Sequence, residues 1–353
     1  SVAFMNADEL LREALHVLAS GERLSPAATA DAIGALISGE ASSVLAAGFL
    51  AALRVQVESV DQVVSAAQVL RQHASRVVTN RGPLVDTCGT GGDGQSTFSI
   101  STAAALVAAG AGAVVAKHGN RAASGNFGGA DTLEALGVAI ELPALGAGHC
   151  LDDAGIAFLF ARQLHPAMRH VAPIRSEMKI RTIFNLLGPL INPAGVTRQV
   201  IGVPSLEALA LVADALLALG AEHALVVHSQ DGLDEISLAA DNDLIEVRGA
   251  KLRAFTLSAA ELDLPEVSPA DLRASTLDDS VRIVRRVLEG VHGPQSDIVA
   301  ANAGAALYVA GISDSIAGGV VRARESIRSG AAADALARLV EISQREWARS
   351  GNG

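Results

Sequence analysis

Aromatic residues, cysteines and runs of basic residues are all scarce in this sequence. Of its 353 residues 50% are hydrophobic but only 3% are aromatic, so the core must be built mainly from Ala, Val, Leu and Ile, a composition that suits close helix packing. Two cysteines, Cys88 and Cys150, cannot form a disulfide framework and lack the spacing of a metal site. A net charge of −11 without any basic run argues against a nucleic-acid partner.

Long apolar stretches are missing as well. The longest weakly polar stretch, residues 103–116, is too short to cross a bilayer and ends at Lys117. Residues 1–6 do not combine a basic start with an apolar segment, so they do not suggest export. We therefore expect a cytoplasmic protein that has no membrane partner.

The first 78 residues predict helices without any strand. Four helix starts are marked by Asn6 with Glu9, by Ser25 before Pro26, by Ser42 or Ser43, and by Ser59 with Gln62. This region is therefore expected to form a separate helical unit.

From Leu84 onward, short apolar runs alternate with helical segments. The expected strands are 84–86, 113–116, 138–140, 156–160, 199–203 and 224–228, with helices between them that include 132–136 and 206–219. Strands separated by helices favour a largely parallel sheet, in which ligands bind beyond the carboxyl ends of the strands.

Two loops at such ends have the composition of a phosphate site. Residues 86–94 read Asp-Thr-Cys-Gly-Thr-Gly-Gly-Asp-Gly between a short strand and a helix, where glycines and free amides can surround an anion. The spacing Gly-x-Gly-x-x-Gly from Gly89 also fits a dinucleotide fold, but the next strand ends in Lys117-His118 instead of the acidic residue that would hold a ribose. The two loops together predict a site for a polyphosphate sugar.

Two adjacent carboxylates, Asp234 and Glu235, follow the expected strand 224–228 and a turn. Adjacent acids on a loop are usually only solvated charges. Opposite a pyrophosphate site they would suit Mg²⁺, which prefers a few carboxylate oxygens together with substrate phosphate. His165 and His170, by contrast, are five residues apart and have no third ligand nearby, so a transition-metal site is not expected there.

The sequence resembles the anthranilate phosphoribosyltransferases over nearly its whole length. The motifs that carry the resemblance are Gly-Thr-Gly-Gly-Asp at 89–93, Lys-His-Gly-Asn-Arg at 117–121, and the segments 165–173, 181–190 with Asn192-Pro193, 231–235 and 302–308. The resemblance implies an α/β protein of the nucleoside phosphorylase/phosphoribosyltransferase type, with a small N-terminal helical domain and a larger α/β domain whose central sheet is mostly parallel.

The resemblance also implies how the chain is divided. Residues 1–78 and 175–197 would form the helical domain, which dimerises in this family, and residues 79–174 and 198–353 would form the α/β domain that binds phosphoribosyl pyrophosphate. Hinges are expected near 79–83 and 161–174. The resemblance therefore implies a homodimer.

The implied reaction moves the phosphoribosyl group of 5-phosphoribosyl 1-pyrophosphate to the amino group of anthranilate. Its products are N-(5-phosphoribosyl)anthranilate and pyrophosphate, and it is the second step of tryptophan biosynthesis from chorismate. Mg²⁺ is implied as cofactor, as two ions. No covalent nucleophile is expected, because such a displacement needs stabilisation of the leaving charge instead.

Site residues follow from the resemblance motif by motif. Phosphoribosyl pyrophosphate would be bound by Gly89, Gly92, Asp93, Thr97, Ser99, Ile100, Ser101, Thr102, Lys117, His118, Gly119, Asn120, Arg121, Ala122, Ala123, Ser124, Gly125 and Gly129. Anthranilate would be bound by Gly89, Asn120, Arg175 and His165, and the metal by Ser101, Asp234 and Glu235.

Three departures from the family pattern bear on substrate choice. Residues 124–129 keep only one hydroxyl, Ser99 stands where Asn is more common, and Arg162 stands where Pro is common. An alternative is therefore a transferase of the same fold that acts on another aromatic amine or a nitrogen base. A non-catalytic relative would more readily have lost Asp234, Glu235 or Lys117, and all three are present.

Overall fold

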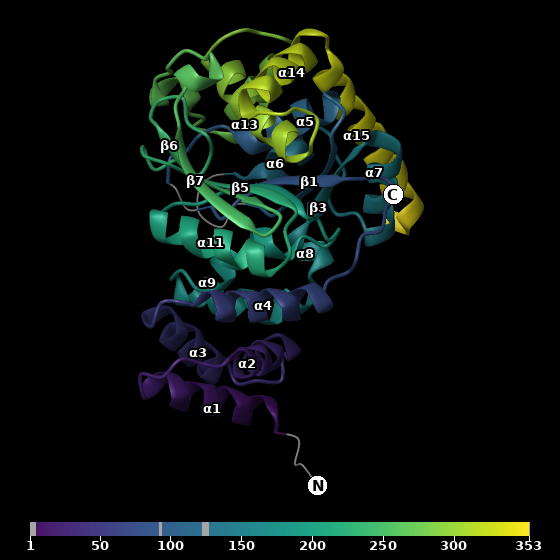
Figure 1. Ribbon diagram of the computed structural model, residues 1–353. Coiled ribbons are helices and arrows are strands. Elements are labelled where there is room, and N and C mark those ends of the chain that lie inside the picture. Colours follow the sequence, from purple (N-terminus) through teal and green to yellow (C-terminus); the bar gives the residue numbers. More distant parts are fainter. Residues whose placement is uncertain (1–4, 92–93, 122–126, 353) are drawn as a thin grey trace.

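The computed structural model describes residues 5–91, 94–121 and 127–352. Its N-terminal end is a stack of four helices, α1 (Ala7–Ala19), α2 (Pro26–Ser38), α3 (Ser43–Val55) and α4 (Val60–Gln72), drawn at the bottom of Figure 1. The capping boxes expected at Asn6 and Ser59 are both present, and the Ser25 side chain accepts a hydrogen bond from the amide of Ala28. The four helix starts are thus confirmed.

A seven-stranded sheet forms the centre of the molecule. Its spatial order is β3 (Ile156–Phe160), β2 (Val114–Gly119), β1 (Leu84–Gly89), β4 (Arg198–Gly202), β5 (His223–Ser229), β6 (Asn242–Arg248) and β7 (Lys251–Leu257). The first five strands in this order run parallel, and β6 and β7 are antiparallel additions. The chain leaves β1 toward β2 on one side and reaches β4 on the other, so β1 is the point where the strand order reverses.

The expectation of a mostly parallel sheet is confirmed, but two details were wrong. Residues 138–140 form no strand: the amide of Val138 donates to the carbonyl of Leu133 and that of Ala139 to the hydroxyl of Ser343, so no strand pairing forms there. The hairpin β6–β7, which closes through Gly249 at φ +57°, was not expected.

Helices cover both faces of the sheet (Figure 1). One face carries α5 (Ile100–Gly110), α6 (Gly129–Ala135), α7 (Ala144–Ala154), α12 (Leu277–Leu288), α13 (Pro294–Val309), α14 (Ile316–Arg328) and α15 (Ala331–Trp347). The other face carries α11 (Leu206–Ala218), which in turn packs on α4. The short elements α8 (Ala161–Leu164), η1 (Pro166–His170), α9 (Ala172–Met178), α10 (Phe184–Leu187) and η2 (Gly188–Ile191) lie between the sheet and α1–α4.

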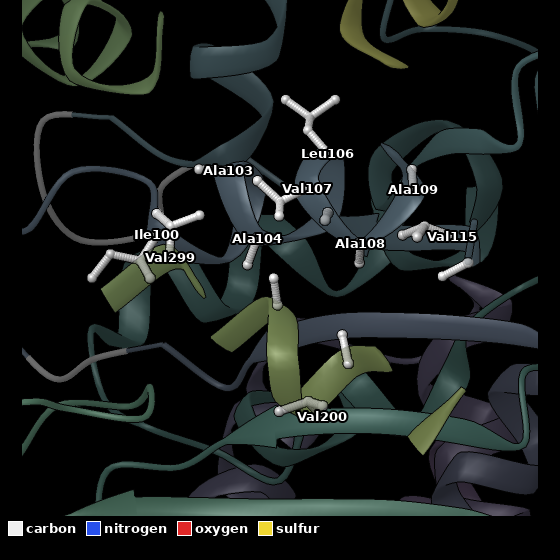
Figure 2. Packing of buried hydrophobic residues seen from close by; sticks show 14 of the residues in the cluster. Ile100, Ala103, Ala104, Leu106, Val107, Ala108, Ala109, Val115, Val200 and Val299 are labelled. Atoms are coloured by element: carbon white, nitrogen blue, oxygen red, sulfur yellow. The ribbon is translucent and has the colours of Figure 1, made fainter. Parts of the chain in front are cut away.

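The core on the α5 side is built from small aliphatic residues, as the composition predicted. Ala104 and Ala108 of α5 point toward the sheet and α13 in Figure 2 and are fully enclosed. Without large side chains the helices approach each other closely: a Cβ added to Gly319 of α14 would lie 2.2 Å from the carbonyl oxygen of Gly304 in α13. This packing holds α13 against α14.

A second hydrophobic cluster joins α1–α4 to the segment that follows α8. Leu36 and Phe49 from the N-terminal helices and Ile183, Leu187 and Leu190 from the 183–191 region belong to one buried group, which continues onto α11. None of the helices in the described parts of the chain combines the length and the apolar character that a membrane span requires.

Candidate active site

The carboxyl ends of the parallel strands meet at one edge of the sheet. β1 ends at Gly89, directly beside Gly202 at the end of β4, while β2 ends at Gly119 and β5 at Ser229. The first turn of α5 begins after Ser99 at the same edge. Backbone amides, the positive end of α5 and the loop after β5 therefore converge on one place.

The loop after β5 lies against the ends of β1 and β4. A Cβ added to Gly202 would lie 1.5 Å from the carbonyl oxygen of Asp234, and one added to Gly89 would lie 2.6 Å from its Oδ2 atom. Only residues without a Cβ allow this approach. The two glycines thus position Asp234 over the glycine loop.

Hydrogen bonds hold the two carboxylates to the glycine loop and to the first turn of α5. Asp234 Oδ2 accepts from the amide of Gly91 at 3.1 Å, and Glu235 Oε1 accepts from the amide of Ser101 at 3.1 Å. Asn302 of α13 fixes the next residue, because its Oδ1 accepts from the amide of Ile236 and its Nδ2 donates to the Ile236 carbonyl. The positions of both carboxylates relative to the backbone amides of the site are therefore fixed by hydrogen bonds.

Lys117 lies beneath the first turn of α5. Its side chain is buried, and Nζ donates to the carbonyl of Thr87 at 2.5 Å and to Ser101 Oγ at 3.2 Å. A fully buried carboxylate, Asp86, balances it: burial raises the pKa of Asp86, and the charge of Lys117 opposes that rise. Lys117 thus places a positive charge next to the Ser101 hydroxyl, at the start of α5.

Asp86 also connects the two sides of the site. Its Oδ1 accepts from the amide of His118 at 3.0 Å and its Oδ2 from Asn192 Nδ2 at 2.8 Å. Asn192 follows η2, so this carboxylate ties the 188–192 segment to β1 and β2. Neither Asp86 nor Asn192 was predicted as a site residue, although an acid inside a buried strand was a visible signal.

Two buried imidazoles form the wall next to this connection. The rings of His118 and His165 lie 5.1 Å apart, and burial lowers the pKa of His118 to about 3 and that of His165 to about 4. His118 Nδ1 donates to the carbonyl of Gly188 at 3.0 Å. Its Nε2 is therefore an unprotonated acceptor, and neither Nε2 atom has a hydrogen-bond partner among the described residues.

Two arginines lie on the helical side of the site, Arg175 within α9 and Arg181 in the segment between α9 and α10. Arg175 lies over the ring of Phe184 at 5.4 Å and donates to Asn185 Oδ1 at 3.5 Å, and burial lowers its pKa. Arg181, which had not been assigned to the site, donates from Nη1 to the carbonyl of Gly91 at 3.1 Å. This contact reaches from the helical side to the glycine loop.

Other predicted residues lie around this centre with partners of their own. Arg121 is bound by Asp131 and Glu134 of α6 at 2.8 and 2.7 Å. Ser99 Oγ lies 2.7 Å from Thr132 Oγ1. Ile100 and Thr102 are buried in the first turn of α5, and Gly129 begins α6 beside Thr102. Gly119 ends β2, Asn120 follows it, and Thr97 forms a backbone bridge with Arg273. Gly92, Asp93, Ala122, Ala123, Ser124 and Gly125 lie outside the described residues.

The ligand set fits magnesium better than a transition metal. Within the ranges that the structure describes, no three His, Cys, Asp or Glu side chains gather as a metal site. Asp234, Glu235 and Ser101 instead offer a few hard oxygen atoms, the kind of ligand that Mg²⁺ prefers. Burial raises the pKa of the Cys88 thiol well above its usual value, so Cys88 is unsuited to be a nucleophile.

Comparison with known proteins defines first the class and then the family. The model of the glycosyl transferase family, a/b domain, matches residues 81–333, and that of its helical bundle domain matches residues 12–74. Anthranilate phosphoribosyltransferase of Rubrobacter xylanophilus is 49% identical over 95% of this chain and 98% of its own length, and that of Laribacter hongkongensis is 47% identical over 95% and 98%.

Solved structures agree. The anthranilate phosphoribosyltransferase of Thermus thermophilus has a TM-score of 0.88 at 44% identity, covering 94% of this chain and 99% of that one. The Saccharomyces cerevisiae enzyme in complex with PRPP and Mg has a TM-score of 0.88 at 28% identity, covering 95% and 98%. The chain belongs to the anthranilate phosphoribosyltransferase family.

The two buried histidines predict a dependence of stability on pH. Unfolded imidazoles titrate near 6.5, whereas these titrate at about 3 and about 4 when folded, so the unfolded chain binds more protons between pH 6.5 and 4. The free energy of unfolding should therefore fall with falling pH, by up to about 1.4 kcal/mol per pH unit for each histidine. Replacing His165→Asn should remove one such contribution.

Urea unfolding at pH 6 and pH 5 measures this slope. The exposed His292→Asn is the matched control and should keep the wild-type slope. An unchanged slope in His165→Asn would show that His165 titrates normally in the folded protein.

Proposed function

We propose that the protein transfers the phosphoribosyl group of 5-phosphoribosyl 1-pyrophosphate to the amino group of anthranilate and releases pyrophosphate, in cytoplasmic tryptophan biosynthesis. The observation that carries the proposal is the pair Asp234 and Glu235, held against the amides of Gly91 in the glycine loop and Ser101 at the start of α5. A pyrophosphate needs such an arrangement of amides and metal-binding acids. The proposal is supported by the Saccharomyces cerevisiae structure, which was solved in complex with PRPP (phosphoribosyl pyrophosphate) and Mg.

The donor pyrophosphate would bind between the glycine loop and the first turn of α5. Asp234, Glu235 and Ser101 would hold Mg²⁺, as two ions, and bound Mg²⁺ would neutralise charge that develops on the leaving pyrophosphate. Lys117 already has two internal acceptors, Thr87 and Ser101, so its charge would act through Ser101 unless one of these bonds is exchanged for a phosphate. Both arrangements stabilise the leaving group electrostatically.

The acceptor would bind between the two histidines and Arg175. His118 Nε2, with no described partner, can accept a hydrogen bond from the amino group. A pKa of about 3 makes this ring a weak base, so it would orient the nitrogen rather than deprotonate it. The guanidinium of Arg175 would pair with the carboxylate. A yeast relative was solved with 4-fluoroanthranilate, a molecule of this kind.

We propose further that residues 1–78 and 175–197 form a helical, dimerising domain and that 79–174 and 198–353 form the α/β domain. The separate matches at 12–74 and 81–333 support a boundary near residue 79, and the second match also spans residues 175–197. Val44 and Val55 on α3 are 78% and 83% exposed and would be covered in a homodimer.

Removing the two acidic charges tests the proposed reaction. Asp234→Asn with Glu235→Gln should lower kcat/KM at least about 100-fold while the far-UV CD spectrum stays unchanged, because the loop acids contribute little to the core. Consumption of anthranilate and of several other aromatic amines is followed with phosphoribosyl pyrophosphate and Mg²⁺.

A control variant removes the same charges elsewhere. Glu13→Gln with Asp31→Asn changes two exposed acids of α1 and α2 and should keep full activity. Undiminished turnover in the Asp234/Glu235 variant would reject the metal assignment. Preference for another amine in the wild type would reject anthranilate as the acceptor.

Arg175 provides a test of the acceptor site. Losing a charged partner in a partly desolvated channel costs about 2–4 kcal/mol, so Arg175→Ala should raise the KM for anthranilate roughly 30-fold or more. The KM for phosphoribosyl pyrophosphate should stay nearly unchanged. Steady-state kinetics with each substrate varied in turn would contradict the assignment if the defect is selective for the donor or equal for both.

A further inference from the structure

A second hollow, separate from the candidate active site, opens between η4 (Pro269–Leu272), α12 and the start of α13. Its volume is about 280 Å³, which suits a small metabolite. Three guanidinium groups, of Arg273, Arg282 and Arg286, line it. None of its lining residues belongs to the crevice formed by Thr87, Ser101 and Glu235.

The positive charge in this hollow is only partly balanced. Arg282 pairs with Asp279 at 2.6 Å. For Arg273 and Arg286, by contrast, neither guanidinium has a hydrogen bond or ion pair with any residue in the described ranges, and Asp271 is the one acid on the wall. Like charges in one hollow repel each other, and a bound anion would relieve that repulsion. The chain as a whole carries a net charge of −11, so this positive surplus is local.

The rest of the wall is apolar. Ile283 and Val287 come from the same face of α12, and Val291, which follows the helix, is 39% exposed. Guanidinium forks match phosphate oxygens, whereas the aliphatic surface would gain from covering an apolar group. The hollow therefore fits a phosphate monoester whose other end is apolar better than it fits inorganic phosphate.

The same elements hold residues 96–99, the donor loop, which lead into α5 at the candidate active site. Thr97 forms an antiparallel bridge with Arg273, the amide of Phe98 donates to the carbonyl of Leu272, and the amide of Ala274 donates to the carbonyl of Ser96, the last two at 3.0 Å. These bonds make residues 96–98 and 272–274 one unit.

α12 supports that loop from a second direction. Its Ser280 Oγ accepts from the amide of Ser99 at 3.1 Å, directly before α5. A ligand bound by Arg273 and Arg286 would therefore join the two elements that hold residues 96–99.

We infer that this hollow is a binding site for phosphate monoesters with an apolar body, and that its occupation stabilises the donor loop. Because a steadier loop loses less conformational freedom when the donor binds, the KM for phosphoribosyl pyrophosphate should fall. This function goes beyond the proposed reaction, and binding at the hollow does not require that the reaction take place.

Calorimetric titration with phenyl phosphate tests the binding site on the full chain. Wild type and Arg285→Gln, an exposed neighbour on α12 that does not line the hollow, should bind with equal affinity. The double variant Arg273→Gln with Arg286→Gln should bind at least about tenfold more weakly, and inorganic phosphate should bind the wild type more weakly than phenyl phosphate does. Equal affinity in all three proteins, or no saturable binding, would overturn the inference.

Kinetics test the connection to the donor loop. Saturating phenyl phosphate should lower the KM for phosphoribosyl pyrophosphate roughly fivefold in wild type and Arg285→Gln, and not in the double variant. A rise of that KM in all three proteins would mean competition at the donor site and would overturn the connection, as would no change. The titration remains decisive for the hollow even if the proposed transfer reaction fails.

Discussion

The approach of Asp234 to the end of β4 determines the geometry of the whole site. Gly202 has no Cβ, so the backbone after β5 can cross the ends of β1 and β4. The side chains of Asp234 and Glu235 then reach the amides of Gly91 and Ser101. Asn302 of α13 then fixes the chain at Ile236. Two strands and two helices far apart in the sequence therefore meet at one acidic pair, and the start of α5 lies opposite it.

A second constraint joins the donor side to the acceptor side. The buried side chains of Lys117 and Asp86 compensate each other's charge, because a single unpaired charge in this interior would be strongly destabilising. Asp86 is also the acceptor for His118 and Asn192, so the helical segment before Asn192 cannot move independently of β1 and β2. Together with the bond from Arg181 to Gly91, this connection sets the distance across the proposed substrate site.

Sequence reasoning succeeded where the signal was local. Caps such as Asn6 with Glu9 act within one turn, and the glycine loops mark strand ends by themselves. It failed where distant partners decide. The β6–β7 hairpin was not expected, and its Glu246 carboxylate accepts hydrogen bonds from Tyr308 of α13, His223 of β5 and Arg253 of β7. The hydrogen-bond partners of Arg181 and Asp86 likewise could not be predicted from the sequence, because they are distant along the chain and only the fold brings them together.

The most direct test of the central role of Gly202 is the affinity for phosphoribosyl pyrophosphate with Mg²⁺, measured by calorimetry on Gly202→Ala. A Cβ there must displace Asp234, so affinity should fall at least about tenfold while far-UV CD stays native. Gly34→Ala, where a Cβ meets nothing within 4 Å, should bind like the wild type. Wild-type affinity in a folded Gly202→Ala protein would contradict the claim that this contact positions the acidic pair.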